Sequence, residues 1–148
     1  MKIYFSCSIS GGRHNEHLYP PIVAHLKHHG EVLTEMFSDD KIVSLDAQVA
    51  DTEIFNRDML WLEESDAVVA EVSTPSFGVG FEVCKSQELG KDVLCLYQNN
   101  QEKKLSAMIS GNPYKKLMVR KYTSLEDAFN HIDEFFARLK GQRPVTIE

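Results

Sequence analysis

Short apolar runs alternate with amphipathic segments along almost the whole chain, and this alternation restricts the fold more than any other feature. Runs with the character of buried strands cover residues 3–7, 31–37, 66–72, 92–97 and 117–119. Apolar residues at helical spacing cover 17–29, 48–64, 78–89 and 125–139. Strands that alternate with helices in this way form a parallel sheet with helices on both faces, so the sequence predicts an α/β fold.

The order of these elements predicts one domain over residues 1–140, followed by a flexible tail at 141–148. We expect a single-domain three-layer sandwich, flavodoxin- or Rossmann-like, with a five-stranded parallel sheet of order 2-1-3-4-5. Gly90 is expected to end the third helix and Ser124 to cap the last one, while 38–45 and 98–104 read as polar connections. Ligands of such sheets bind beyond the strand ends where the strand order reverses, which here lies between loops 8–13 and 73–80.

Composition narrows the classes of function. The 148 residues carry a formal net charge of −6, which argues against a nucleic-acid-binding protein because such a protein needs a basic face. No apolar run approaches the roughly 20 residues that span a membrane, and the first residues lack the pattern of a signal peptide. Cys7, Cys84 and Cys95 form no close pair, which is typical of reduced thiols in a cytoplasmic protein.

Residues 73–82 carry the clearest functional pattern. The apolar run 67–72 ends in a turn of small residues, which opens a helix that holds Glu82 near its start. The first N–H groups of a helix are free and its dipole favours anions, so this layout suits an anionic substrate group beside an acid. Asp58, on the preceding helix, is the second candidate. A retaining glycosidase uses two such carboxylates, although Asp66 and Glu71 remain rivals on sequence alone.

Residues 7–13 (CSISGGR) provide an alternative. A cysteine followed after five residues by an arginine, directly behind a first strand, is the layout of a phosphatase loop with Cys7 as nucleophile and Arg13 as phosphate clamp. That chemistry also needs a general acid, and the only comparable late segment has Asn112 before Pro113.

Metal and cofactor chemistry find little support. The chain has six histidines, and His14 with His17 and His25 with His28 are three residues apart, but no third ligand has a suggestive spacing. We therefore expect no metal site. Gly11 and Gly12 lack the spacing of a dinucleotide fingerprint, and we expect no cofactor.

Six segments in one order resemble the 2'-deoxynucleoside 5'-phosphate N-hydrolases, which are relatives of the nucleoside 2-deoxyribosyltransferases. The resemblance extends from residue 3 to about residue 139. It rests on residues 4–13 (YFSCSISGGR), 32–35 (VLTE), 58–62 (DMLWL), 65–72 (SDAVVAEV), 75–82 (PSFGVGFE) and 105–111 (LSAMISG).

The resemblance implies cleavage of the N-glycosidic bond of a deoxynucleoside 5'-monophosphate. It implies that Glu82 is the nucleophile, that Asp58 protonates the leaving base, and that Tyr4 orients Glu82. Substrate contacts are implied for Cys7, Ser8, Ile9, Ser10, Gly11, Gly12, Arg13, Ser76, Gly78 and Ser106. Ser106 would come from the neighbouring subunit of a homodimer. Deoxyribosyl transfer between bases is the nearest alternative reaction, and a nucleotide-binding module without catalysis is the alternative from another class.

Overall fold

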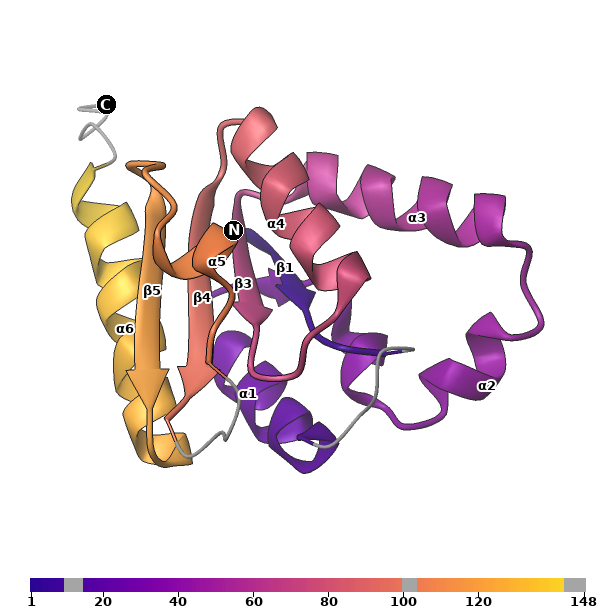
Figure 1. Ribbon diagram of the computed structural model, residues 1–148, viewed down its shortest axis with the longest axis horizontal. Helices are drawn as coiled ribbons and strands as arrows, with labels where there is room; N and C mark the ends of the chain where they lie inside the picture. The colour runs from indigo at the N-terminus through magenta and orange to yellow at the C-terminus, as the bar shows by residue number, and fades with distance from the viewer. Residues whose placement is uncertain (10–14, 100–103, 143–148) are drawn as a thin grey trace.

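A computed structural model describes residues 1–9, 15–99 and 104–142 (Figure 1). Five parallel strands form one sheet in the order β2-β1-β3-β4-β5, which confirms the predicted topology. The strands are β1 (Lys2–Ser6), β2 (Glu31–Val32), β3 (Ala67–Glu71), β4 (Asp92–Gln98) and β5 (Leu117–Tyr122). Every residue of the central strand β3 is buried, as expected of a strand covered on both faces.

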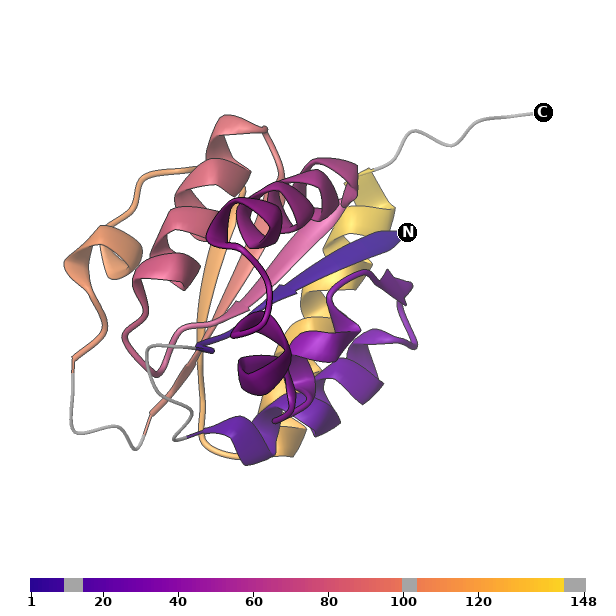
Figure 2. The ribbon, with the colours of Figure 1, turned by 90° about the vertical axis from the view of Figure 1, so that its right-hand side faces the viewer.

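Helices cover both faces of the sheet. Figure 2 shows α1 (Tyr19–Leu26) and α6 (Leu125–Gln142) on one side, and α3 (Asp51–Glu64) and α4 (Phe77–Glu88) on the other. The shorter helices are η1 (Glu16–Leu18), η2 (Glu35–Ser38), α2 (Ile42–Asp46) and α5 (Ala107–Ser110). No helix within residues 1–9, 15–99 and 104–142 is long and apolar enough to cross a bilayer.

The second strand is much shorter than the predicted run 31–37, because a side chain replaces the backbone in pairing with β1. The last backbone bond runs from the Leu33 N–H to the carbonyl of Ile3, at 2.9 Å. Beyond it, the buried Thr34 hydroxyl accepts from the N–H of Phe5 at 2.8 Å and donates to its carbonyl at 2.7 Å. Both polar groups of Phe5 are thus satisfied, and the chain is free to turn into η2.

Other boundaries differ from the sequence prediction for local reasons. The predicted helix 17–29 divides into η1 and α1, because two prolines occupy the first positions of α1 and lack the N–H of an inner turn. The segment 38–45 contains α2 rather than an irregular connection, and the predicted helix 48–64 begins at Asp51. The edge strand β5 continues past residue 119 to Tyr122. The apolar pattern stops at residue 119 because charged side chains follow, which an edge strand tolerates.

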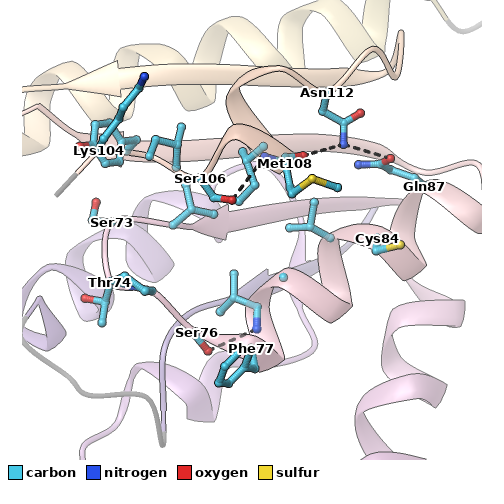
Figure 3. A pocket seen from close by; sticks show the side chains of 18 residues that line it. Ser73, Thr74, Ser76, Phe77, Cys84, Gln87, Lys104, Ser106, Met108 and Asn112 are labelled. Atoms are coloured by element: carbon cyan, nitrogen blue, oxygen red, sulfur yellow. Dashed lines mark hydrogen bonds between the residues drawn. The ribbon is translucent and has the colours of Figure 1, made fainter.

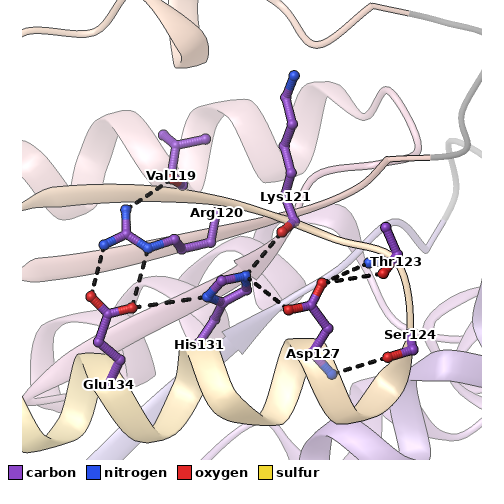
Figure 4. A network of polar contacts seen from close by, with 8 residues as sticks. All are labelled: Val119, Arg120, Lys121, Thr123, Ser124, Asp127, His131 and Glu134. Carbon is purple, nitrogen blue, oxygen red and sulfur yellow. Dashed lines mark hydrogen bonds and ion pairs between the residues drawn. The ribbon is translucent and has the colours of Figure 1, made fainter.

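Two predicted helix ends are confirmed. Gly90 has φ +72°, a left-handed conformation that glycine adopts without strain after the end of α4. The Ser124 hydroxyl accepts from the Asp127 N–H at 3.1 Å and caps α6, within a polar network that ties this helix to β5 (Figure 4). Helix α6 extends to Gln142, two residues into the predicted tail, and residues 143–148 lie outside the described part of the chain.

The Thr34 bridge makes a prediction about stability. Replacing Thr34 by Val keeps the shape but leaves the buried N–H and carbonyl of Phe5 without partners, so we expect the free energy of unfolding to fall by about 1–3 kcal/mol. Thr34→Ser retains the hydroxyl and should lose much less. Urea denaturation of both variants measures the difference, and equal losses would show that the hydroxyl bridge contributes nothing.

Candidate active site

The Glu82 carboxylate lies at the centre of the candidate site, on the second turn of α4. The Tyr4 hydroxyl donates to its Oε1 at 2.8 Å, and the Ser6 hydroxyl donates to its Oε2. Tyr4 and Ser6 are two residues apart on β1 and therefore point to the same face of the sheet, where α4 lies. Burial raises the pKa of Glu82 to about 7, although both hydrogen bonds oppose the shift. Burial also raises the pKa of Tyr4, so its hydroxyl keeps the proton that it donates.

Asp58 faces the same space from α3. Its Oδ1 accepts from Arg57 Nε at 2.8 Å, and Arg57 also donates from Nη1 to Asp46 at 2.9 Å. The Arg57 guanidinium lies 5.2 Å from the ring centre of Trp61 and 5.7 Å from that of Phe37, which fixes its plane. Burial raises the pKa of Asp58 while Arg57 lowers it, and the net direction is upward.

Asp58 and Glu82 line one open cavity of about 660 Å³. The negative charge of Asp58 further raises the pKa of Glu82, so the two acids interact electrostatically. Most of the remaining wall is apolar and comes from the segment after β1, from α2 and its C-cap, and from α3 and α4: Cys7, Ile9, Val43, Ala47, Ile54, Phe55, Met59, Val79 and Phe81. The cavity therefore offers two carboxylates of raised pKa beside a wall that suits a flat, partly apolar ring.

The N-terminus of α4 opens into this cavity. Ser76 is the N-cap residue, and its hydroxyl accepts from the Val79 N–H at 3.4 Å. The N–H groups of Phe77 and Gly78 precede the first complete turn and have no acceptor within the helix. A Cβ at Gly78 would meet only the Ser76 hydroxyl, at 3.8 Å, and one at Gly80 would meet nothing within 4 Å. The described chain thus leaves room beside these amides for an anion.

The rival acids lie elsewhere. Asp66 accepts from the backbone N–H of Lys2 at 2.7 Å, at the opposite end of the strands from the cavity. Glu71 points to the other face of the sheet, where it accepts from Ser73 and, at 3.0 Å, from the Tyr122 hydroxyl. Burial raises its pKa to about 7 as well, yet it does not line the cavity. Of these four candidate acids, only Glu82 and Asp58 line the cavity.

The first glycine loop is only partly described. Cys7 and Ile9 line the cavity, whereas Ser8 is fully buried outside its wall, and its hydroxyl has no hydrogen-bond partner among the described residues. The Cys7 thiol donates to the carbonyl of Phe37 at 3.5 Å, an interaction that a nucleophilic thiolate cannot make. The predicted contacts Ser10, Gly11, Gly12 and Arg13 lie outside the described residues.

Ser106 does not reach the Glu82 cavity of its own chain. It caps the short helix α5 and lines a second cavity of about 500 Å³, between α4 and α5 (Figure 3). The two cavities share Ser76 and Val79, which lie at the start of α4. Phe77, which is fully exposed, and Met108, which is largely exposed, flank the second cavity. Such uncovered apolar side chains are typical of a surface that meets another protein.

Sequence reasoning missed two groups that hold the acids. Ser6 could have been found, because it lies two residues after Tyr4 on the same strand and must share its face. Arg57 directly precedes Asp58, but neighbouring residues on a helix point in different directions. Its contact with Asp58 depends on the bend of the long side chain over Trp61, for which the sequence contains no pattern.

Comparison with known proteins identifies the family of this chain. The family model described as nucleoside 2-deoxyribosyltransferase matches residues 3–130. A Nematostella vectensis protein, provisionally named 2'-deoxynucleoside 5'-phosphate N-hydrolase 1, is 45% identical over 141 residues, which cover 93% of this chain and 95% of that protein. The 5-hydroxymethyl-dUMP N-hydrolase of Danio rerio is 39% identical over 140 residues, covering 94% and 98%.

A solved structure shares the fold. The CMP N-glycosidase of Clostridium botulinum superposes with a TM-score of 0.68 at 14% sequence identity, over 91% of this chain and 99% of that one. This likeness concerns the fold alone, while the family model and the sequence relatives cover nearly the whole described chain. The chain therefore belongs to the nucleoside 2-deoxyribosyltransferase family.

Proposed function

We propose that this protein hydrolyses the N-glycosidic bond of 2'-deoxynucleoside 5'-monophosphates to the free base and 2-deoxyribose 5-phosphate. The observation that carries the proposal is the Glu82 carboxylate, which Tyr4 and Ser6 hold in one cavity with Asp58 and the N-terminus of α4. The names of the sequence relatives, which are N-hydrolases of deoxynucleotides, support the same substrate class.

In the proposed reaction, a Glu82 oxygen attacks C1' of the deoxyribose. The bond between C1' and the base nitrogen breaks, its electron pair goes to the base, and Asp58 supplies the proton. Water then attacks C1' of the glycosyl ester, gives its proton to Asp58 and releases Glu82 as a carboxylate. Burial raises the pKa of Asp58, the direction that helps a carboxyl group to hold a proton for donation, and the two reaction steps retain the configuration at C1'.

We place the 5'-phosphate at the start of α4. The amides of Phe77 and Gly78, together with the Ser76 hydroxyl, offer donors beside a helix dipole. The loop that contains Ser8, Ser10, Gly11, Gly12 and Arg13 would complete this site from β1, with Cys7 and Ile9 against the sugar or base. Binding energy from the phosphate then holds C1' next to Glu82 in a reactive geometry.

We further propose a homodimer in which Ser106 of each chain completes the site of the other. Ser106 lies on a cavity that is separate from that of Glu82 in its own chain but adjoins the same helix start. The exposed Phe77 and Met108 would be covered by such an interface. Cys7, Cys84 and Cys95 form no disulfide with one another, which suits a reducing compartment, and we place the enzyme in the cytoplasm on that ground.

Deoxyribosyl transfer to a second base is the other candidate function, since the family model takes its description from that activity. The glycosyl ester on Glu82 is common to both reactions, and only the acceptor differs. Excess free base added to a reaction with a deoxynucleotide separates the two: a nucleotide that carries the added base demonstrates transfer, while free sugar phosphate demonstrates hydrolysis.

The first prediction concerns the nucleophile. Glu82→Gln keeps the size and a hydrogen-bond acceptor but removes the attacking carboxylate, so kcat for base release should fall by about a thousandfold or more. Glu71→Gln, on the opposite face of the sheet, should retain activity. The assay offers each of the four deoxynucleoside monophosphates, with deoxyguanosine and GMP as controls, and separates the products by chromatography. Release of nucleoside with inorganic phosphate would refute the proposal and favour Cys7.

The second prediction concerns pH. Glu82 attacks only when ionised, and its pKa is raised to about 7, so kcat/KM should fall as pH drops below about 7. Ser6→Ala removes a hydrogen bond that lowers this pKa, so the acidic limb of the profile should move to higher pH. Ser86→Ala is the matched control, because Ser86 donates to the backbone carbonyl of Glu82 at 2.6 Å and leaves the carboxylate untouched. Identical profiles for Ser6→Ala and the wild type would contradict this role.

The third prediction concerns the shared site. If Ser106 acts across the interface, Glu82→Gln and Ser106→Ala chains are each weakly active alone but regain activity when mixed. Each mixed dimer then contains one site with both native residues, so activity should approach half that of the wild type when all dimers are mixed. Light scattering after size-exclusion chromatography checks the dimer. A mixture no more active than its components would place Ser106 outside the partner's site.

A further inference from the structure

Three potential metal ligands meet between α1 and α6, away from the Glu82 cavity. His25 lies in the last turn of α1, and His29 lies in the turn that follows the helix. Their Nε2 atoms lie 2.8 Å and 2.7 Å from the same oxygen, Oδ1 of Asp133 on α6. One ligand atom from each of the three residues falls within a group whose members are all within 4.8 Å of one another.

Aromatic stacking holds both imidazoles in place. The His25 ring lies parallel to that of Phe129, with 4.3 Å between centroids and 9° between planes, and the His29 ring stacks on Phe136 at 4.6 Å and 13°. The histidine side chains are only 18% and 14% exposed, whereas Asp133 is 53% exposed. The cluster is therefore rigid on its inner side and open to solvent at the carboxylate, which is how a surface ion site is entered.

We propose that His25, His29 and Asp133 form a binding site for Zn²⁺. Neutral imidazole nitrogens and a carboxylate oxygen are ligands that zinc prefers, and three protein ligands leave a fourth tetrahedral position for water. The two imidazole nitrogens and the carboxylate oxygen all lie within 4.8 Å of one another, so the three ligand atoms are close enough together to surround one ion. The imidazoles would carry their protons on Nδ1, which leaves both Nε2 atoms free to bind the ion.

The affinity of this site should be moderate. The Nδ1 of His29 is buried and has no hydrogen-bond partner among the described residues, so the metal-bound form lacks the acceptor that usually orients and strengthens a zinc-bound histidine. Loss of such a partner typically costs about 10–100-fold in affinity, so we expect this site to bind more weakly by that factor than one whose two histidines are both oriented.

Zinc bound at this site would stabilise the folded chain. The ion would join α1 to α6 through residues 108 and 104 positions apart in the sequence, on the face of the sheet opposite to α3 and α4 (Figure 2). An ion that binds the folded chain only shifts the folding equilibrium by mass action. At zinc about 100-fold above its dissociation constant, Tm should rise by about 5–10 °C.

The test titrates untagged, EDTA-dialysed protein with Zn²⁺ alone and measures binding by calorimetry and Tm by circular dichroism. Since Cys84 is exposed, all variants carry Cys84→Ser, which removes a competing thiol ligand. Asp133→Asn and His29→Gln each remove a direct ligand and should weaken binding by about a hundredfold or more, which removes most of the rise in Tm. His28→Gln is the matched control: this exposed residue belongs to the same turn but not to the ligand set, so binding should be unchanged.

Binding at one ion per chain that depends on both Asp133 and His29 supports the proposal. It is overturned if the wild type takes up no zinc in the micromolar range, or if Asp133→Asn and His29→Gln bind as tightly as the control. Asp133→Asn changes an exposed carboxylate to its amide, and its circular dichroism spectrum verifies that the fold persists. The readout does not involve nucleotide hydrolysis, so it stands or falls independently of the proposed activity.

Discussion

The two hydrogen bonds from β1 to the Glu82 carboxylate are the contacts on which the arrangement of the site depends. A carboxylate this close to the sheet is costly to bury unless its oxygens have partners, and Tyr4 and Ser6 supply one for each oxygen. The same bonds fix where the second turn of α4 lies over the sheet. The N-terminus of α4, with Ser76 and Gly78, is thereby held at the cavity into which Asp58 points.

The early end of β2 serves the same cavity. Because the Thr34 hydroxyl satisfies Phe5, the chain can leave the sheet and form η2, which buries Phe37. Phe37 then packs edge-on against Tyr4, lies under the Arg57 guanidinium, and its carbonyl accepts a hydrogen bond from the Cys7 thiol. A longer strand would have kept these residues in the sheet, so a shortened edge strand gives the site one of its supports.

Sequence reasoning predicted the parts of this structure that depend on local pattern. Apolar runs and helical spacing predict the sheet order, and the small residues around Ser76 predict a helix start beside Glu82. Contacts that depend on three-dimensional approach were beyond it. The Thr34 hydroxyl takes the place of a strand backbone in pairing with Phe5. The Arg57 side chain lies over the Trp61 ring, and Asp133 contacts His29, which is 104 residues away in the sequence. No periodic pattern of residues in the sequence predicts these contacts.

The open space around Gly80 points to something outside the single chain. Glycine inside a helix costs roughly 0.5–1 kcal/mol relative to alanine, and nothing in the described chain lies within 4 Å of the place where a methyl group would sit. The described chain therefore offers no steric reason for a glycine at this position. A ligand or a neighbouring subunit that passes close to this turn of α4 would supply such a reason.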